Sequence, residues 1–103
     1  MPRPNGKQVT HTITSTSEVT VMDKIYSNRD TNRGLTVAVK TTQAGTAKIK
    51  YTWTDGTNLE LDSKVMTADS FHLFDFDFPV PESVVTFDAD SASGTVTVEA
   101  IVY

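Results

Sequence analysis

The amino-acid sequence predicts an all-β fold, a single antiparallel β-sandwich or jelly-roll type domain of seven to eight short strands. Apolar and polar residues alternate with a period of two along most of the chain, which is the pattern of half-buried strands. Threonine and valine, which favour strands, are frequent throughout. Turn residues recur about every 10 positions, the spacing that is typical of sandwiches and barrels. Together these observations predict that strands dominate the chain.

Length and charge limit the domain organisation and the partners. A chain of 103 residues fits one domain. We expect a flexible N-terminal arm at residues 1–6, which holds two prolines, and a β-sandwich domain at residues 7–103. The formal net charge of −4 disfavours nucleic acid, and the lack of cysteine excludes disulfides. Because no apolar run has signal-peptide or membrane-spanning length, we expect neither a Sec signal nor a membrane partner.

The first half of the chain is expected to hold four strands. Their limits follow from the alternating apolar residues, and they cover residues 7–15, 18–26, 35–39 and 47–53. The polar segment 27–34 is the longest predicted loop, and Gly34 allows it to close with a positive φ. The third and fourth strands, joined by a turn at residues 43–45, are expected to form a hairpin.

The second half begins with Asp55-Gly56, a strong turn signal. A fifth short strand starts at Leu59. Residues 62–70 are ambiguous between a single helical turn and an irregular crossing. Three further strands are expected at residues 71–78, 83–87 and 95–103, and the last is expected to turn its valines inward.

The phenylalanine-rich strand at residues 71–78 raises a chemical question. Its apolar alternation changes phase between Leu73 and Phe74, so we expect a bend there. Asp75 and Asp77 lie on one face of the strand, about 7 Å apart. A carboxylate pair at that spacing suits an inverting glycosidase. We expect simple alternation instead, with the phenylalanines inward and the aspartates outward.

Other motifs give no support for an enzyme, and we expect none. The two histidines, His11 and His72, lie in predicted strands and are expected to be structural. Segment 88–94 has acidic residues spaced like those of a calcium loop. However, Ala92 offers no side-chain oxygen and Gly94 falls one position late. A turn between strands is therefore expected there, with no metal and no cofactor.

Two groups of side chains could bind a partner. Tyr51 and Trp53 could present an aromatic platform to a sugar, but their strand spacing beside apolar residues favours packing in the core. Arg29 and Arg33, in the polar loop, could hold an anionic partner or pair locally with Asp30. The sequence leaves both uses of the arginines open.

Two stretches of the chain resemble small β-sandwich proteins of tailed-phage virions. In the first, an alternating strand meets an Asp-Gly-Thr-Asn turn and a short strand leads away, GTAKIKYTWTDGTNLELDS at residues 45–63. The second comprises FDFP at residues 76–79 and GTVTV at residues 94–98. The resemblance covers about half of the chain. Leu59 stands where an aromatic residue commonly follows the turn in that family, so no binding residue is transferred.

The resemblance implies a structural virion protein of a bacteriophage, a capsid decoration or cement protein that binds the major capsid protein and stabilises the shell. We expect a homo-oligomer, with a trimer favoured, at the capsid surface after synthesis in the host cytoplasm. The alternative is a carbohydrate-binding or receptor-binding accessory module of a phage tail or head fibre. Contacts are expected from the arm, the polar loop and the outer face of the last strand, at Pro2, Arg3, Pro4, Arg29, Arg33, Ile101 and Tyr103.

Overall fold

The computed structural model describes residues 6–103, and its regular elements are all strands. They are β1 (Gly6–Thr12), β2 (Val19–Tyr26), β3 (Leu35–Thr41), β4 (Gly45–Thr52), β5 (Asn58–Met66), β6 (Ser70–Phe76), β7 (Glu82–Ala89) and β8 (Thr95–Val102). The predicted all-β fold is confirmed. The predicted arm at residues 1–6 lies outside the described residues except for Gly6, which begins β1. Over residues 6–103, no helix has the length and apolar character needed to cross a membrane.

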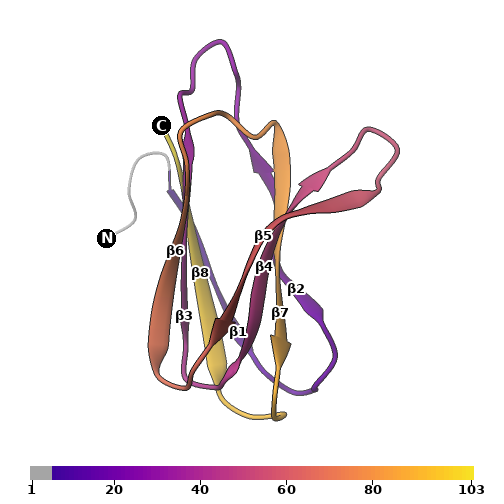
Figure 1. Cartoon of the computed structure of the whole chain (residues 1–103), viewed down its shortest axis with the longest axis vertical. Helices are drawn as coiled ribbons and strands as arrows, with labels where there is room; N and C mark the ends of the chain where they lie inside the picture. The colour runs from indigo at the N-terminus through magenta and orange to yellow at the C-terminus, as the bar shows by residue number, and fades with distance from the viewer. Residues whose placement is uncertain (1–5) are drawn as a thin grey trace.

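The eight strands form two antiparallel sheets packed face to face (Figure 1). Sheet A has the order β1-β8-β3-β6, and sheet B has the order β2-β7-β4-β5. The pairs β1–β8, β2–β7, β3–β6 and β4–β5 are those of one long hairpin whose tip lies between β4 and β5. Successive pairs alternate between the sheets, so the hairpin is wound around itself. This strand order defines the jelly-roll form of the β-sandwich.

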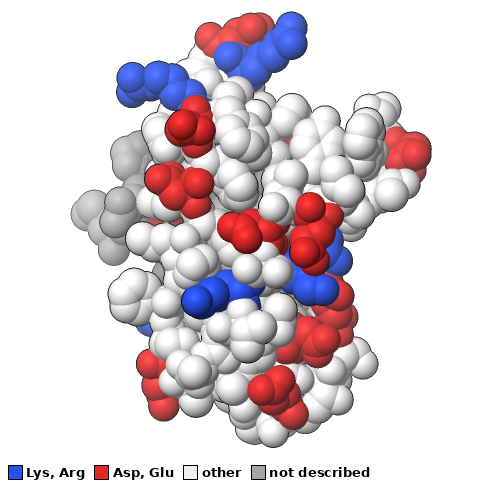
Figure 2. Space-filling model, viewed as in Figure 1, with Lys and Arg blue, Asp and Glu red and all other residues white. Residues whose placement is uncertain are grey.

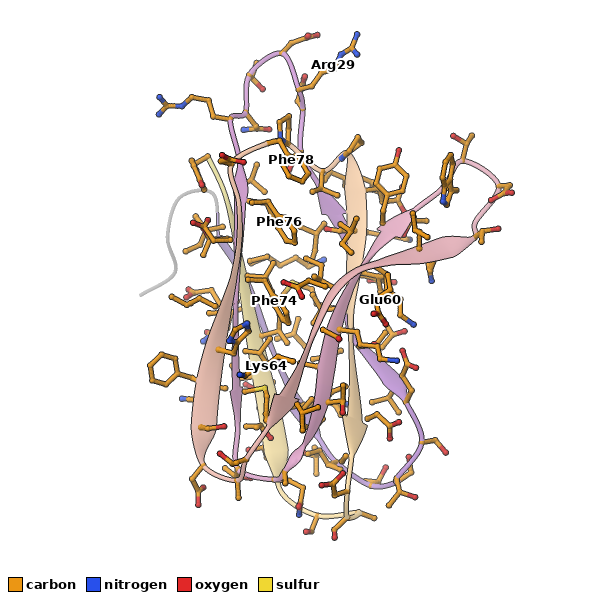
Figure 3. The ribbon with its side chains drawn as sticks, in the orientation of Figure 1. Arg29, Glu60, Lys64, Phe74, Phe76 and Phe78 are labelled. Atoms are coloured by element: carbon orange, nitrogen blue, oxygen red, sulfur yellow. The ribbon has the colours of Figure 1, made fainter. Side chains whose placement is uncertain are left out.

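The core lies between the sheets and is built from alternate residues of each strand. In β8, Val96, Val98 and Ala100 are buried, as predicted. Phe74 of β6 and Phe87 of β7 are the bulkiest fully buried side chains, and Figure 3 shows Phe74 pointing into the space between the sheets. Burial of each such ring contributes about 1.5–3 kcal/mol to folding, and each sheet provides one of the two rings.

The predicted hairpin of the third and fourth strands is wrong, because β3 lies in sheet A and β4 in sheet B. The chain changes sheets at a corner after Thr41. The hydroxyl of Thr41 donates to the carbonyl of Gln43 (2.7 Å) and accepts from its N–H (3.1 Å). At the start of β4, an added Cβ on Gly45 would lie 2.7 Å from the ring of Phe87. Alternation alone does not distinguish a hairpin from such a crossing, since both use a short turn.

The bend predicted between Leu73 and Phe74 is also wrong. β6 pairs with β3 in an uninterrupted register along its whole length. Phe74 therefore faces the core, whereas Phe71 and Leu73 face solvent and are 74% and 55% exposed. The change of phase marks two apolar side chains on the outer face of sheet A instead of a bulge. The ambiguous residues 62–70 complete β5, turn at residues 67–69 and enter β6.

Candidate binding surfaces

The two arginines predicted as contact residues lie on the loop between β2 and β3. Figure 2 shows the basic groups at this end of the sandwich, and Figure 3 labels Arg29. Arg29 lies 3.9 Å from Asp30, and their side chains are 86% and 85% exposed, so this ion pair contributes little. Asn28 Oδ1 accepts from the N–H of Asp30 (2.9 Å), and the N–H of Asn28 donates to Asn32 Oδ1 (2.6 Å). These bonds fix the loop, and a contact role for Arg29 and Arg33 stays a prediction.

The predicted contact residues of the last strand do not lie at a sheet edge, because β8 lies between β1 and β3. Tyr103 packs its ring against Gly34 and donates its hydroxyl to Asp75 (3.2 Å). Ile101 is half-buried on the outer face of sheet A. Its contact with a partner through that face stays a prediction. The predicted arm contacts, Pro2, Arg3 and Pro4, lie outside the described residues.

The predicted alternation is confirmed within β6, where Phe74 is buried, Phe76 packs against the core and Asp75 is exposed. It is wrong for Phe78, which lies beyond the end of β6 and is 51% exposed. The carboxylate of Asp75 accepts a bond from the Thr36 hydroxyl (2.7 Å) on the neighbouring strand. Asp77 lies beyond the end of β6. The half-buried His72 packs edge-to-face on Phe74, with ring centroids 4.7 Å apart. In residues 6–103, no three His, Asp or Glu side chains form a group that could hold a metal ion.

A cleft of about 440 Å³ opens beside β2, β4 and β7 at one end of sheet B. Three aromatic side chains line it together with a proline, a carboxylate, two threonines and a glycine: Tyr26, Tyr51, Trp53, Pro81, Glu82, Thr52, Thr54 and Gly56. We call it the aromatic cleft. Tyr51 packs against the core, but the prediction that Trp53 does so is wrong, since Trp53 is 51% exposed. The physical reason is that β4 ends at Thr52, so Trp53 lies on the hairpin that projects from the sandwich (Figure 1).

The turn that carries Trp53 is fixed by its own hydrogen bonds. The Trp53 N–H donates to the Thr57 carbonyl (2.7 Å), and the Gly56 N–H donates to the Trp53 carbonyl (2.9 Å). The Asp55 carboxylate accepts from the Thr57 N–H (2.9 Å), and this bond lowers the pKa of Asp55 below its ordinary value. Gly56 has a φ of 90°, which favours glycine. The predicted Asp55-Gly56 turn is confirmed, and the Trp53 ring meets the Tyr51 ring edge-to-face with centroids 5.6 Å apart.

A more polar hollow of about 240 Å³ continues the aromatic cleft. The two share Thr52, Gly56 and Glu82, and the polar hollow adds Thr20, Asp23, Lys24, Asn58 and Val84. β2 shapes this region, because its pairing with β7 has two register shifts and Lys24 adopts a φ of 54°. The aromatic cleft and the polar hollow therefore form one groove with an apolar part and a polar part.

Sheet edges form a second class of candidate surface, since an exposed edge strand can pair with another chain. Most of the described edges carry features that oppose such pairing. β2 is interrupted by its register shifts, and β5 has a register shift and three charged residues. β1 carries Lys7, whose Nζ donates to the Asp23 carbonyl of β2 (2.9 Å) and so bridges the two sheets at that side.

β6 lacks those features. It contains no lysine and no proline, its register is uninterrupted, and its single charged residue is Asp75. Its outward residues Phe71 and Leu73 are the exposed apolar pair described above. Phe71 also lines two shallow hollows of about 360 and 240 Å³ on the outer face of sheet A, beside Lys40 and Thr97. We call this strand with its two apolar side chains the β6 edge.

The outer face of sheet B is organised differently, by a polar network around Glu18. Lys50 Nζ and the Thr86 hydroxyl both donate to Glu18 Oε2 at 2.6 Å. The bonds from Lys50 and then Thr86 lower the pKa of Glu18 below its ordinary value. Lys48 and Glu60 add an ion pair at 3.6 Å. These four charged side chains are therefore paired within the domain.

Comparisons with known proteins show the fold alone. No protein-family model matches the chain, and no curated protein sequence matches it. Among solved structures, 132 chains match. The PBSX exported protein XepA has a TM-score of 0.74 at 7% identity over 94% of this chain, which spans 36% of XepA. The SPBc2 prophage-derived protein YomS has a TM-score of 0.51 at 19% identity, over 94% of this chain and 93% of its own.

A third structure is a mutant of the family 29 carbohydrate-binding module CBM29-2. It has a TM-score of 0.51 at 14% identity, over 97% of this chain and 67% of its own. Proteins that share this fold therefore include phage-related proteins and a carbohydrate-binding module. The likeness therefore shows a β-sandwich fold and does not choose among possible uses of the two surfaces.

Sequence reasoning named Tyr51 and Trp53 as a possible aromatic platform, although it favoured their burial, and it missed the other residues of these surfaces. Tyr26 of β2 lies opposite Glu82 of β7 in the sheet. The two residues are 56 positions apart in the sequence, and no sequence pattern indicates that they are neighbours. Phe71 and Leu73 did give a signal, the apolar residues out of phase with Phe74. That signal was interpreted as a bend, although outward apolar side chains on a regular strand produce the same pattern.

Proposed function

We propose that this chain is a structural protein of a bacteriophage particle, which stabilises the shell by contact with the major capsid protein and with a second copy of itself. The β6 edge carries the proposal, because an unprotected edge with exposed apolar side chains is a surface for protein contact. The phage context is supported by the fold likeness to XepA and to the prophage-derived YomS, and by the sequence resemblance described above.

The β6 edge suits pairing with a second copy. When two copies of β6 run antiparallel about a two-fold axis at His72, Phe71 of each copy lies opposite Leu73 of the other. Cross-strand pairs of this kind each contribute about 0.2–1 kcal/mol. The ladder also satisfies the row of backbone groups that β6 presents beyond its pairing with β3. A two-fold contact gives a dimer, whereas a trimer, as expected from the sequence, needs a contact through a different surface.

The paired sheets present one broad face to the shell. Two copies of sheet A join at β6 and bring Phe71 and Leu73 of both copies to the middle of that face. Lys40 and Thr97, beside the hollows that Phe71 lines, supply polar groups around the apolar centre. An apolar centre with a polar rim is the usual composition of a protein interface. The major capsid protein docks on this face.

Particle binding tests the proposal. Phage particles stripped of the chain are incubated with the wild-type protein, with Leu73→Lys or with Val65→Lys, and bound protein is measured by co-sedimentation. Val65 is a matched control, because it is an exposed apolar residue, 77% exposed, on the other sheet. We expect the wild type and Val65→Lys to rebind and Leu73→Lys to lose rebinding. Equal rebinding by all three, or none by the wild type, contradicts the proposal.

A further inference from the structure

The aromatic cleft lies on sheet B and shares no residue with the β6 edge. Two of its three rings, those of Tyr51 and Trp53, are held in place before any ligand arrives. Tyr51 is packed on the core and supports the Trp53 ring edge-to-face, at an interplanar angle of 70°. The turn at Gly56 adds three hydrogen bonds and a left-handed glycine. A preordered surface loses little entropy on binding, so exposed rings held in this way favour a binding site.

The polar part of the groove is rich in acceptors. Asp23 and Glu82 contribute carboxylates, which only accept hydrogen bonds when ionised. Asn58 adds an amide, whose oxygen already accepts a bond from Thr52 (3.0 Å). Among residues 6–103, Lys24 is the single cation that lines the groove. A ligand that matches this lining must therefore offer several donors close to an apolar face.

We infer that the groove binds a neutral oligosaccharide. One pyranose ring stacks its C–H face on the half-exposed Trp53, with Tyr26 beside it. The neighbouring sugar unit of the oligosaccharide directs its hydroxyls at Glu82, Asp23 and Asn58. Aromatic walls with a few placed polar groups are the usual lining of small-molecule sites. The shared residues join the two hollows, so the groove holds more than one sugar unit. This site is independent of the proposed role in the virion.

Three other classes of ligand fit the groove less well. A proline-rich peptide has backbone carbonyls and few N–H groups, so it leaves the two carboxylates of the polar part, Asp23 and Glu82, without donors. A quaternary ammonium group needs rings that surround one point, whereas here the apolar part opens into a second, polar hollow. Anionic sugars are disfavoured by Glu82 and Asp23, which repel them.

The test is a glycan array that carries neutral, sialylated and uronic-acid glycans, followed by calorimetric titration of the strongest neutral glycan. Variants Trp53→Ala and Glu82→Gln are compared with Phe71→Ala, which removes an exposed aromatic ring outside the groove. We expect Trp53→Ala to weaken binding by about tenfold or more, as the loss of a ring that stacks on the ligand does. Phe71→Ala should bind like the wild type, and unchanged thermal midpoints show that the variants are folded.

Several results would overturn the inference. One is that no neutral glycan binds the folded wild-type protein. Another is that a glycan binds with equal affinity to Trp53→Ala. A third is that decaproline or tetramethylammonium shifts the NMR signals of Tyr26 and Trp53 while neutral glycans leave them unchanged. None of these results depends on particle binding, so this site and the β6 edge are tested separately.

Discussion

Tyr103 occupies the space that a side chain on Gly34 would need. An added Cβ at position 34 would lie 2.7 Å from the Tyr103 ring. The same two residues exchange backbone hydrogen bonds, from Gly34 N–H to the Tyr103 carbonyl at 2.8 Å and from Tyr103 N–H to the Gly34 carbonyl at 3.1 Å. This contact attaches the end of the chain to the start of β3, so it contributes to stability as well as to the shape of this end of sheet A.

Substitution of Gly34 should therefore destabilise the domain. We expect Gly34→Ala to lower the free energy of unfolding by about 1–3 kcal/mol, the cost of inserting a methyl group into a packed site. In the Tyr103→Ala background the same change should cost less, because the ring is gone. Some cost should remain, because the added Cβ would also meet the Phe76 carbonyl oxygen. Urea denaturation of the two single variants and the double variant measures this coupling. Strictly additive losses would show that the two residues are not in contact.

The Glu18 network predicts that the free energy of unfolding falls at acid pH. Lys50 and Thr86 lower the pKa of Glu18 in the folded protein, whereas the unfolded chain has the ordinary value of about 4.3. A lowered carboxyl pKa stabilises the fold fully above the unfolded value, and this contribution is lost as pH falls through the folded value. The wild type should therefore lose stability relative to Glu18→Gln when the pH falls below about 4.3.

Urea unfolding at a series of pH values from about 7 down to about 3 measures that difference. Lys50→Met removes the larger cause of the shift and should show a smaller loss on acidification than the wild type. If the wild type and Glu18→Gln remain parallel over the whole range, Glu18 does not make these bonds in solution.

Trp53 and Phe74 should differ in their contribution to stability. Trp53 is half exposed, so we expect Trp53→Ala to cost about 1 kcal/mol or less, mainly the contact with Tyr51. Phe74 is 1% exposed, and Phe74→Ala should cost about 3–5 kcal/mol. Thermal and urea unfolding of the two variants provide the comparison. A cost for Trp53→Ala as large as that for Phe74→Ala would place the tryptophan in the core.

The sequence predicted the features that depend on local pattern. Most strand positions, the Asp55-Gly56 turn and the inward valines of β8 follow from periodicity and turn chemistry, and they are present. Residues 62–66 of β5 were left ambiguous, and Gly34 does not adopt the predicted positive φ. The features that failed depend on which strands are neighbours. The hairpin of β3 and β4 and the burial of Trp53 were inferred from adjacency in the chain, whereas the jelly roll separates β3 from β4 and ends β4 before the tryptophan.

The candidate surfaces were harder to predict for the same reason. Tyr26, Trp53 and Glu82 come from three segments that meet only because β2 and β4 both pair with β7. The β6 edge is recognised as unprotected only once the sheet order shows that β6 ends its sheet. Composition identified the aromatic residues, and topology decided which of them are exposed.

Sedimentation equilibrium of the purified chain tests the β6 edge most directly. The account predicts that the wild type and Val65→Lys associate as dimers and that Leu73→Lys sediments as a monomer at the same concentration, with a circular dichroism spectrum like that of the wild type. A wild type that stays monomeric at every concentration, or a Leu73→Lys variant that associates as strongly as the wild type, would contradict it.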